Sequence, residues 1–222
     1  MKQSEIDKAL KSIARAVAKQ HGWKCVAGQP YWTTGPLFFD LGPLARAKTG
    51  QFSWSLRVKW LELDRLLWQV LDLSSNEAEP FSLHANGAFV LTGQEVAGCS
   101  SKGHDWSVGE LADQVELAAQ LAGQRAQQIA EHVTTIDAYI EFLQRTQEAY
   151  ILRYPNGLGD VWTEMLLVAL LKNDRTEVRQ IARARIAADD EGRFYSKGLS
   201  FYERALLLCD ESDAVQSQKQ LH

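Results

Sequence analysis

The chain carries the segment FSWSLRVKWLELDRLLWQVL at residues 52–71, in which two hydrophobic periods follow one another. In its first half every second residue is apolar, which indicates a strand with one buried face. That face consists of Phe52, Trp54, Leu56, Val58 and Trp60. In the second half the apolar residues recur at helical spacing, as Leu63, Leu66, Leu67, Val70 and Leu71. Three of the seven tryptophans lie here, so we expect this segment at the centre of the core.

The residues before this segment predict one helix followed by short strands. Apolar residues three and four positions apart predict a helix over residues 4–20, and Ser4 with Asp7 predicts a capping box at its start. Turns that contain Gly or Pro then separate short β-type runs over residues 23–60. Pro43 lies inside the third run, which predicts a bulge, a break or an edge position there.

Two segments after residue 80 carry weaker signals. Residues 81–92 contain Asn86-Gly87 between apolar residues, which is typical of a β-hairpin. Residues 93–106 show no clear period. We therefore expect this second segment to connect two parts of the chain.

The C-terminal half predicts five helices with short joints. The helical segments are residues 107–133, 134–152, 159–172, 174–189 and 197–210. Three of them begin with a Ser, Thr or Asp that is followed three positions later by an acidic residue: Ser107 with Glu110, Thr134 with Asp137, and Asp174 with Glu177. The tail from Ser212 is polar, and we expect it to fray.

Together these signals predict an α+β fold. An N-terminal helix packs on a small, mostly antiparallel sheet, and an all-helical C-terminal subdomain follows. We expect a sheet domain at residues 1–95, a helical subdomain at residues 107–210 that packs against it, and a polar tail at residues 211–222. The two larger parts could also form one continuous domain.

Composition places the chain among ordinary globular proteins, because 45% of the residues are hydrophobic and 23% are charged. No apolar run approaches the roughly 20 residues that span a bilayer, and the N-terminus lacks the apolar region of a signal peptide. The cysteines Cys25, Cys99 and Cys209 are odd in number and far apart, which predicts free thiols. We therefore expect a cytoplasmic protein that makes no use of a membrane.

The charges are unevenly distributed along the chain. Residues 1–60 carry ten Lys or Arg against three Asp or Glu, whereas residues 61–148 carry four against fourteen. The acidic section predicts a basic protein partner, and its candidate contact residues are Glu110, Asp113 and Glu116. The favoured alternative is that the two sections face one another or are simply solvated.

The basic residues form two candidate anion or nucleic-acid sites. In the first, Arg57 and Lys59 share one strand face with Arg46 nearby in sequence, and Tyr31 or Trp32 could stack on bases. In the second, three arginines four residues apart form a ridge on one helix: Arg175, Arg179 and Arg183. For both sets a solvated face is the favoured interpretation.

Catalytic and metal signatures are weak. The chain has neither a C-x-x-C nor an H-E-x-x-H motif, so we expect no metal site and no cofactor. Cys99, His104 and Asp105 have the residue types of a cysteine nucleophile site, but neighbouring His and Asp rarely orient one another. Residues 157–160, Gly-Leu-Gly-Asp, are better explained as a helix–helix turn than as a phosphate loop. No catalytic residue is predicted.

The first part of the chain resembles a bacterial family of uncharacterised domains found among the immunity genes of polymorphic toxin systems. The resemblance covers residues 1–95 and depends on the placement of aromatic and apolar residues. The residues that carry it are Trp23-Lys24, Tyr31-Trp32, residues 37–41, Lys59, Asp64, residues 66–68 and residues 82–89. It implies an immunity role and supplies no catalytic residues.

The leading hypothesis is therefore a non-enzymatic protein that binds another protein, which would be a toxin if the resemblance holds. The second hypothesis is nucleic-acid binding through the basic section at residues 1–60. The third is an enzyme of undetected type, which predicts a concave, polar-lined pocket with shifted titrating groups. The oligomeric state stays open.

Overall fold

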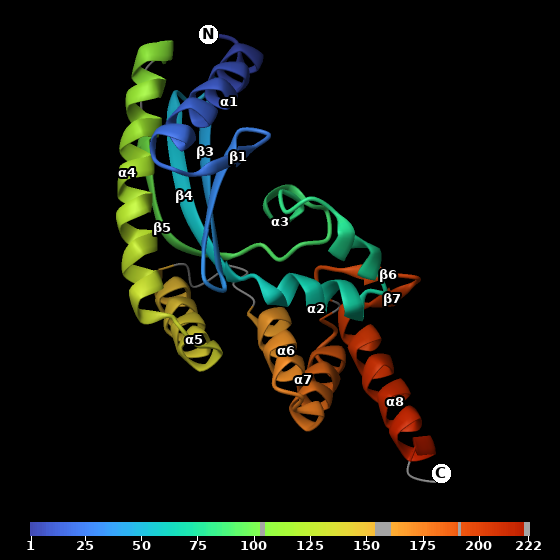
Figure 1. Ribbon diagram of the computed structural model, residues 1–222. Coiled ribbons are helices and arrows are strands. Elements are labelled where there is room, and N and C mark those ends of the chain that lie inside the picture. Colours follow the sequence, from blue (N-terminus) through green and yellow to red (C-terminus); the bar gives the residue numbers. More distant parts are fainter. Residues whose placement is uncertain (103–104, 154–160, 191, 220–222) are drawn as a thin grey trace. The chain divides into compact units, whose positions relative to one another are not determined.

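The computed structural model describes residues 1–102, 105–153, 161–190 and 192–219. It confirms the predicted α+β fold, because a helix precedes an antiparallel sheet and helices follow it (Figure 1). Contacts divide the chain into two compact units. The first unit comprises Met1–Leu61, Phe81–Ala88 and Thr92–Tyr139, and the second comprises Glu62–Pro80, Phe89–Leu91 and Ile140–His222. The domains predicted at residues 1–95 and 107–210 stay a prediction.

The sheet of the first unit is a five-stranded antiparallel meander. Its strands are β1 (Lys24–Val26), β2 (Gln29–Thr34), β3 (Leu37–Arg46), β4 (Gln51–Trp60) and β5 (Gln94–Lys102). The strand predicted in residues 52–60 is β4, and it pairs with β3 from Gln51↔Arg46 to Trp60↔Leu37. It also pairs with β5, so the alternating segment lies inside the sheet.

Pro43 occupies an edge position, as predicted. Strand β2 pairs with β3 only as far as Tyr31↔Asp40, whereas β3 continues to Arg46. Beyond Asp40, therefore, β3 pairs with β4 alone among the strands that the structure describes. A residue without an N–H group is tolerated more easily where a strand has a neighbour on one side only.

Two helices cover one face of this sheet: α1 (Gln3–Gln20) and α4 (Val108–His132) (Figure 1). The buried stripe of α1 is close to the predicted one and consists of Ile6, Leu10, Ala14, Val17 and Ala18. The strands contribute Leu41, Leu56 and Val58, all fully buried. The core of the unit therefore lies between this sheet face and the two helices.

The starts of these helices confirm one predicted cap and correct another. Ser107 and Glu110 form the predicted capping box at α4, because the Glu110 N–H donates to Ser107 Oγ at 3.2 Å and the Ser107 N–H donates to the Glu110 carboxylate at 2.8 Å. At α1 the pair predicted from Ser4 was wrong. The helix begins one residue earlier, and the Lys2 N–H donates to the carboxylate of Glu5 at 2.8 Å.

Two predictions between residues 81 and 106 were wrong. The predicted hairpin is the short helix α3 (Leu83–Asn86), and the predicted connector contains the edge strand β5. At α3, the rings of Phe81 and His84 pack at the sheet face, so tertiary contact overrides the turn signal. At β5, Gly93 passes so close to β4 that a Cβ atom would lie 2.6 Å from the Val58 carbonyl oxygen.

The second unit contains α2 (Glu62–Val70), a 3₁₀ turn η1 (Ser74–Ala78), most of α5 (Ile136–Arg153), α6 (Trp162–Leu171), α7 (Arg175–Ala187) and α8 (Phe201–Lys219). Helix α6 is buried on several sides, as its nearly continuous apolar sequence predicts. It packs against α2 and α7, and α7 packs against α8.

The starts of α7 and α5 compare one cap that was predicted correctly with one that was misplaced by a residue. Asp174 accepts a hydrogen bond from the Glu177 N–H at 3.0 Å, as predicted for α7. At α5 the capping oxygen comes from Thr135, one residue after the predicted Thr134, and it accepts from the Ala138 N–H at 3.2 Å.

The last predicted helix, at residues 197–210, is displaced toward the C-terminus. Residues 195–200 form a two-stranded hairpin, β6 (Tyr195–Ser196) and β7 (Leu199–Ser200), and α8 begins at Phe201. A capping box that we did not predict explains this start, because Ser200 and Glu203 exchange backbone-to-side-chain hydrogen bonds. Helix α8 continues to Lys219, so most of the predicted frayed tail is helical.

Candidate functional site

The predicted protein-contact residues all lie in the first three turns of α4. Glu110 is half-buried and occupied by the capping box described above. Glu116 accepts hydrogen bonds from His21 Nε2 at 2.7 Å and from Gln120 Nε2 at 3.0 Å. Asp113 is exposed. The three carboxylates therefore have different surroundings, and Asp113 is the one whose side chain is exposed.

The hydrogen bond from His21 lowers the pKa of Glu116 below its usual value, and the bond from Gln120 acts in the same direction. Partial burial opposes these effects but is smaller than the first. Glu116 is thus ionised at neutral pH and ties the end of α1 to α4. This contact was missed by sequence reasoning, because 95 residues separate the two side chains.

The solvent side of α4 carries two large apolar side chains that the sequence analysis did not single out. Leu117 is 48% exposed and Leu121 is 43% exposed, and they lie one turn apart. We call the exposed stripe of Asp113, Leu117, Leu121 and Gln128 the outer face of α4. The opposite side of the helix is buried against the unit, so this face is its free side.

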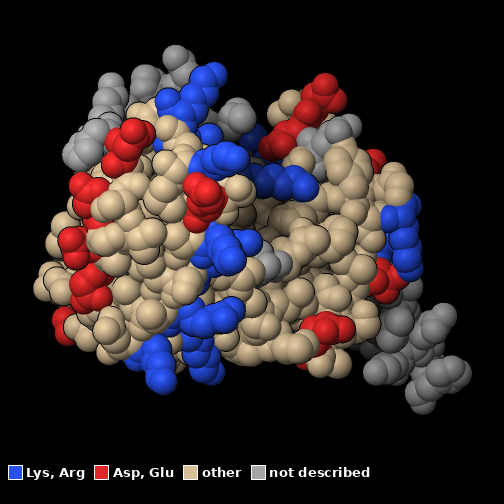
Figure 2. All heavy atoms as spheres, turned by 90° about the horizontal axis from the view of Figure 1, so that it is seen from above, with Lys and Arg blue, Asp and Glu red and all other residues tan. Residues whose placement is uncertain are grey.

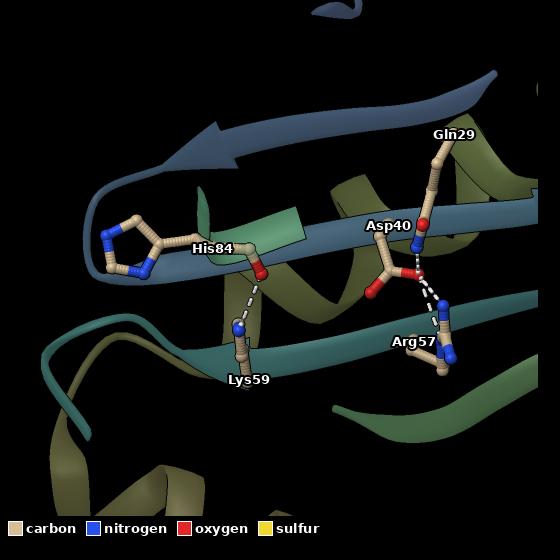
Figure 3. A network of polar contacts seen from close by, with 5 residues as sticks. All are labelled: Gln29, Asp40, Arg57, Lys59 and His84. Atoms are coloured by element: carbon tan, nitrogen blue, oxygen red, sulfur yellow. Dashed lines mark hydrogen bonds and ion pairs between the residues drawn. The ribbon is translucent and has the colours of Figure 1, made fainter. Parts of the chain in front are cut away.

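The other face of the sheet carries a polar network (Figure 3). One oxygen of Asp40 accepts hydrogen bonds from Arg57 and from Gln29 Nε2, the latter at 2.7 Å. Asp40 on β3 and Arg57 on β4 are directly opposite in the register, and Asp40 is only 6% exposed. Ion pairing and hydrogen bonding satisfy this buried carboxylate, and the network fixes the pairing of β2, β3 and β4.

Lys59, predicted to contact anions, is 1% exposed. Its ammonium donates to the backbone oxygen of His84 at 2.8 Å and lies 5.1 Å from the centre of the Phe38 ring. Figure 3 shows the α3 segment with His84 beside the strand that carries Lys59. Contact between Lys59 and an external phosphate would therefore require α3 to move.

The other cationic residues predicted to bind anions differ in their exposure and in their contacts within the chain. Arg46 is exposed at the end of β3. In α7, Arg183 is exposed and Arg175 is half-buried, whereas Arg179 donates to Asp210 of α8 at 3.2 Å. Of the two predicted stacking aromatics, Tyr31 is 7% exposed and stacked on Phe38, and only Trp32 keeps part of its surface. The two cationic sets are therefore partly committed to contacts within the chain.

A cationic stripe that sequence reasoning did not identify lies on α1. Its members are exposed and spaced three or four residues apart: Lys8, Lys11, Arg15 and Lys19. Figure 2 shows a band of Lys and Arg side chains and, apart from it, acidic side chains gathered along one edge. The signal was present in the sequence as the polar side of the predicted helix at residues 4–20.

The weak catalytic candidates do not form a site that the structure describes. Cys99 is exposed in β5, and Asp105 is exposed. His104 and the Gly-Leu-Gly-Asp segment at residues 157–160 lie outside the described residues. Asp64, one of the residues that carry the resemblance, is fully buried and accepts a hydrogen bond from the Leu91 N–H at 2.8 Å.

Comparisons with protein-family models, curated protein sequences and solved structures return no match to this chain. The resemblance to the immunity-gene family therefore stays a prediction. Among the described residues, no cluster of His, Cys, Asp and Glu side chains could hold a metal ion. The helices in that part of the chain also include none with the length and apolar character needed to cross a bilayer.

Proposed function

We propose that this chain is a non-enzymatic cytoplasmic protein that binds a basic protein partner through the outer face of α4. The observation that carries the proposal is the exposure of Leu117 and Leu121 next to Asp113. Exposed apolar side chains that are neighbours on one element, with charged groups around them, are typical of protein-binding surfaces.

Charge favours a basic partner. The outer face begins at Asp113, and Glu110 and Glu116 lie three residues before and after it on the helix. The surrounding section, residues 61–148, has ten more acidic than basic residues. Complementary charge accelerates association and selects among partners, whereas the desolvated apolar side chains supply most of the affinity. If the resemblance noted above holds, the partner is a toxin that this chain neutralises.

The first test is affinity capture with the tagged full-length chain and two matched variants. The double variant Leu117→Ser/Leu121→Ser removes the apolar centre of the outer face. The control Leu207→Ser makes the same change on α8, where Leu207 is 43% exposed. We expect one protein to be retained by the wild type and the control, and its affinity for the double variant to be at least about tenfold lower, which corresponds to roughly 1.4 kcal/mol.

The second test uses the captured partner and the variant Asp113→Lys. We expect the association rate to fall, and to fall more at low salt than at high salt, because exposed charges are screened. Asp113 is the suitable position, because reversing Glu110 or Glu116 would also break an intramolecular contact. Equal retention of the partner by all variants, or a rate that ignores both charge and salt, would contradict the proposal.

A second candidate function is nucleic-acid binding through the cationic stripe on α1. It predicts affinity for generic oligonucleotides that falls steeply with salt, since phosphate contacts release counterions. The test is a binding titration at low salt with the wild type and with Lys11→Glu/Arg15→Glu. No binding at low salt, or equal binding by the double variant, would end this alternative.

A further inference from the structure

The first unit contains a pocket of about 340 Å³ that the sequence analysis did not predict. Eight residues from two distant parts of the chain line it: His21, Trp23, Trp32, Ala119, Gln120, Gly123, Gln124 and Gln127. Its size lies near the lower end of the range for small-molecule sites, about 300–1,000 Å³. His21 and Trp23 lie in the connection between α1 and β1, Trp32 lies on β2, and the other five residues come from α4.

One wall of the pocket is aromatic. The rings of Trp23 and Trp32 are stacked with their centres 6.4 Å apart and their planes at 26°. Trp32 also stacks on Phe39 with ring centres 5.5 Å apart, and Trp23 is only 9% exposed. Packing therefore holds both indoles in place, while Trp32 keeps part of its surface open to the pocket.

The other wall is made of carboxamides. Gln120, Gln124 and Gln127 follow one another on α4 at intervals of four and three residues, so they lie on one side of the helix. Each carboxamide both donates and accepts hydrogen bonds. Gln120 is oriented by its bond to Glu116, which in turn binds His21 at the edge of the pocket.

Gly123 keeps room between these side chains. A Cβ atom built on Gly123 would meet nothing within 4 Å, so the space beside the helix is open at this position. Glycine in the middle of a helix costs roughly 1 kcal/mol relative to alanine. A larger residue here would gain helix stability and would occupy the pocket.

The two walls define the chemistry of a suitable ligand. A flat nucleobase can stack on one aromatic face, but the wall opposite the tryptophans carries carboxamides in place of a second ring. A phosphorylated ligand needs cations, and none of the eight lining residues is Lys or Arg. A sugar ring has an apolar C–H face for the indole and hydroxyl groups that match carboxamides.

We propose that this pocket binds a neutral sugar, with its C–H face on Trp32 and its hydroxyl groups toward Gln120, Gln124 and Gln127. The proposal is independent of partner binding through the outer face of α4. It gives this chain a small-molecule or glycan ligand in addition to a protein partner.

The test measures binding of a panel of neutral glycosides to the full-length chain by ligand-observed NMR and tryptophan fluorescence. The panel contains the methyl glycosides of glucose, galactose and mannose, together with N-acetylglucosamine, and adenosine serves as the flat-ring comparison. We expect at least one sugar to bind saturably with a dissociation constant of about 1 mM or tighter, equivalent to roughly −4 kcal/mol.

Two variants of α4 make the test specific. Gly123→Leu places a side chain in the pocket, and we expect it to weaken sugar binding at least about tenfold. Gly109→Leu is the matched control, because Gly109 lies on the same helix, does not line the pocket, and a Cβ atom there also meets nothing within 4 Å. Circular dichroism of both variants checks that the fold is retained.

Three outcomes would overturn the proposal: no saturable binding of any sugar, equal binding by Gly123→Leu, or tighter binding of adenosine than of every sugar. The variant Leu117→Ser/Leu121→Ser should bind sugar like the wild type. A variant that loses partner capture but keeps sugar binding bears on the partner proposal alone. A variant that loses sugar binding but keeps partner capture bears on the sugar proposal alone.

Discussion

The two faces of the sheet in the first unit are both buried in part, but by different means. The face under α1 and α4 is apolar, with Phe39, Leu56 and Val58 completely buried. The face beside α3 buries Asp40 and Lys59 as well as Tyr31 and Phe38. The first face needs only close packing, whereas the second needs a partner for every charge that it removes from water.

This difference shows what a hydrophobic period can and cannot predict. Alternation in residues 52–60 correctly separates the two faces of β4. It suggests that Lys59 is solvated, yet α3 covers this residue and leaves it 1% exposed. A polar residue opposite an apolar face is therefore exposed only where no other segment packs on it. The following four experiments test the contrast, from the largest expected effect to the smallest.

The apolar face should be the most sensitive to truncation. We expect Leu56→Ala to lower the free energy of unfolding by about 3 kcal/mol, because a fully buried leucine leaves both lost transfer energy and a cavity. Ser53→Ala, on the opposite face of the same strand and half-buried, should change it by less than about 0.5 kcal/mol. Urea unfolding measures the free energy of unfolding of both variants. Equal losses from Leu56→Ala and Ser53→Ala would contradict the proposed difference between the two faces.

Breaking the ion pair on the second face should cost about 2 kcal/mol. Asp40→Ala leaves Arg57 without its carboxylate, and the usual cost for a buried pair is reduced here because the Arg57 side chain is 28% exposed. The double variant Asp40→Ala/Arg57→Ala should lose less than the sum of the two single variants. Strictly additive losses in urea unfolding would show that the pair contributes no coupling energy.

Replacing the buried cation by an apolar side chain of similar length should have a smaller effect. We expect Lys59→Met to change the free energy of unfolding by no more than about 1 kcal/mol, since a well-packed apolar residue often matches a buried charge in stability. Lys59→Ala, which also removes the stem, should cost about 2 kcal/mol. If the methionine variant loses as much as the alanine variant, the ammonium contributes more than the packing.

The smallest effect concerns the contact that joins α1 to α4. Glu116→Gln should cost no more than about 0.5 kcal/mol at pH 7, because the His21 and Glu116 side chains are 27% and 36% exposed and solvent screens their pairing. The pKa of Glu116 is lowered in the folded chain. Its contribution is thus complete above the ordinary value of about 4.5 and disappears as the pH falls through the lowered pKa.

Thermal unfolding of the wild type and of Glu116→Gln at several pH values tests this pH dependence. The difference between the wild type and Glu116→Gln should shrink as the pH falls below about 4. A difference that stays constant or grows as the pH falls below about 4 would contradict the assigned direction of the pKa. The control is Asp113→Asn, which changes an exposed carboxylate on the same helix.

Most secondary structure could be predicted from the sequence, because its signals are local. The period of β4, the buried stripe of α1 and the caps at Ser107 and Asp174 each depend on residues within one or two turns. The missed elements depend on remote partners. Strand β5 has little alternation of its own and is defined by its hydrogen bonds to β4, whereas α3 is held at the sheet face through Phe81 and His84.

The candidate sites also combine features with local sequence signals and features that depend on remote partners. The acidic residues of α4 could be found from their charge, but which of them is available depended on His21, which lies 95 residues from Glu116. The exposure of Leu117 and Leu121 could not be separated from burial by period alone. The sugar pocket was invisible to sequence reasoning, since residues 21–32 and 119–127 have no local relation to one another.

The sequence by itself determined the fold class, the order of most elements and the apolar face of each clear helix or strand. It did so because the spacing of side chains along a helix or a strand repeats within a few residues. Only the tertiary structure decided the burial of Lys59, the pairing of β5, the partner of Glu116 and the position of the tryptophans opposite α4. These features arise from segments that are distant in the chain, and no local pattern records which segments will meet.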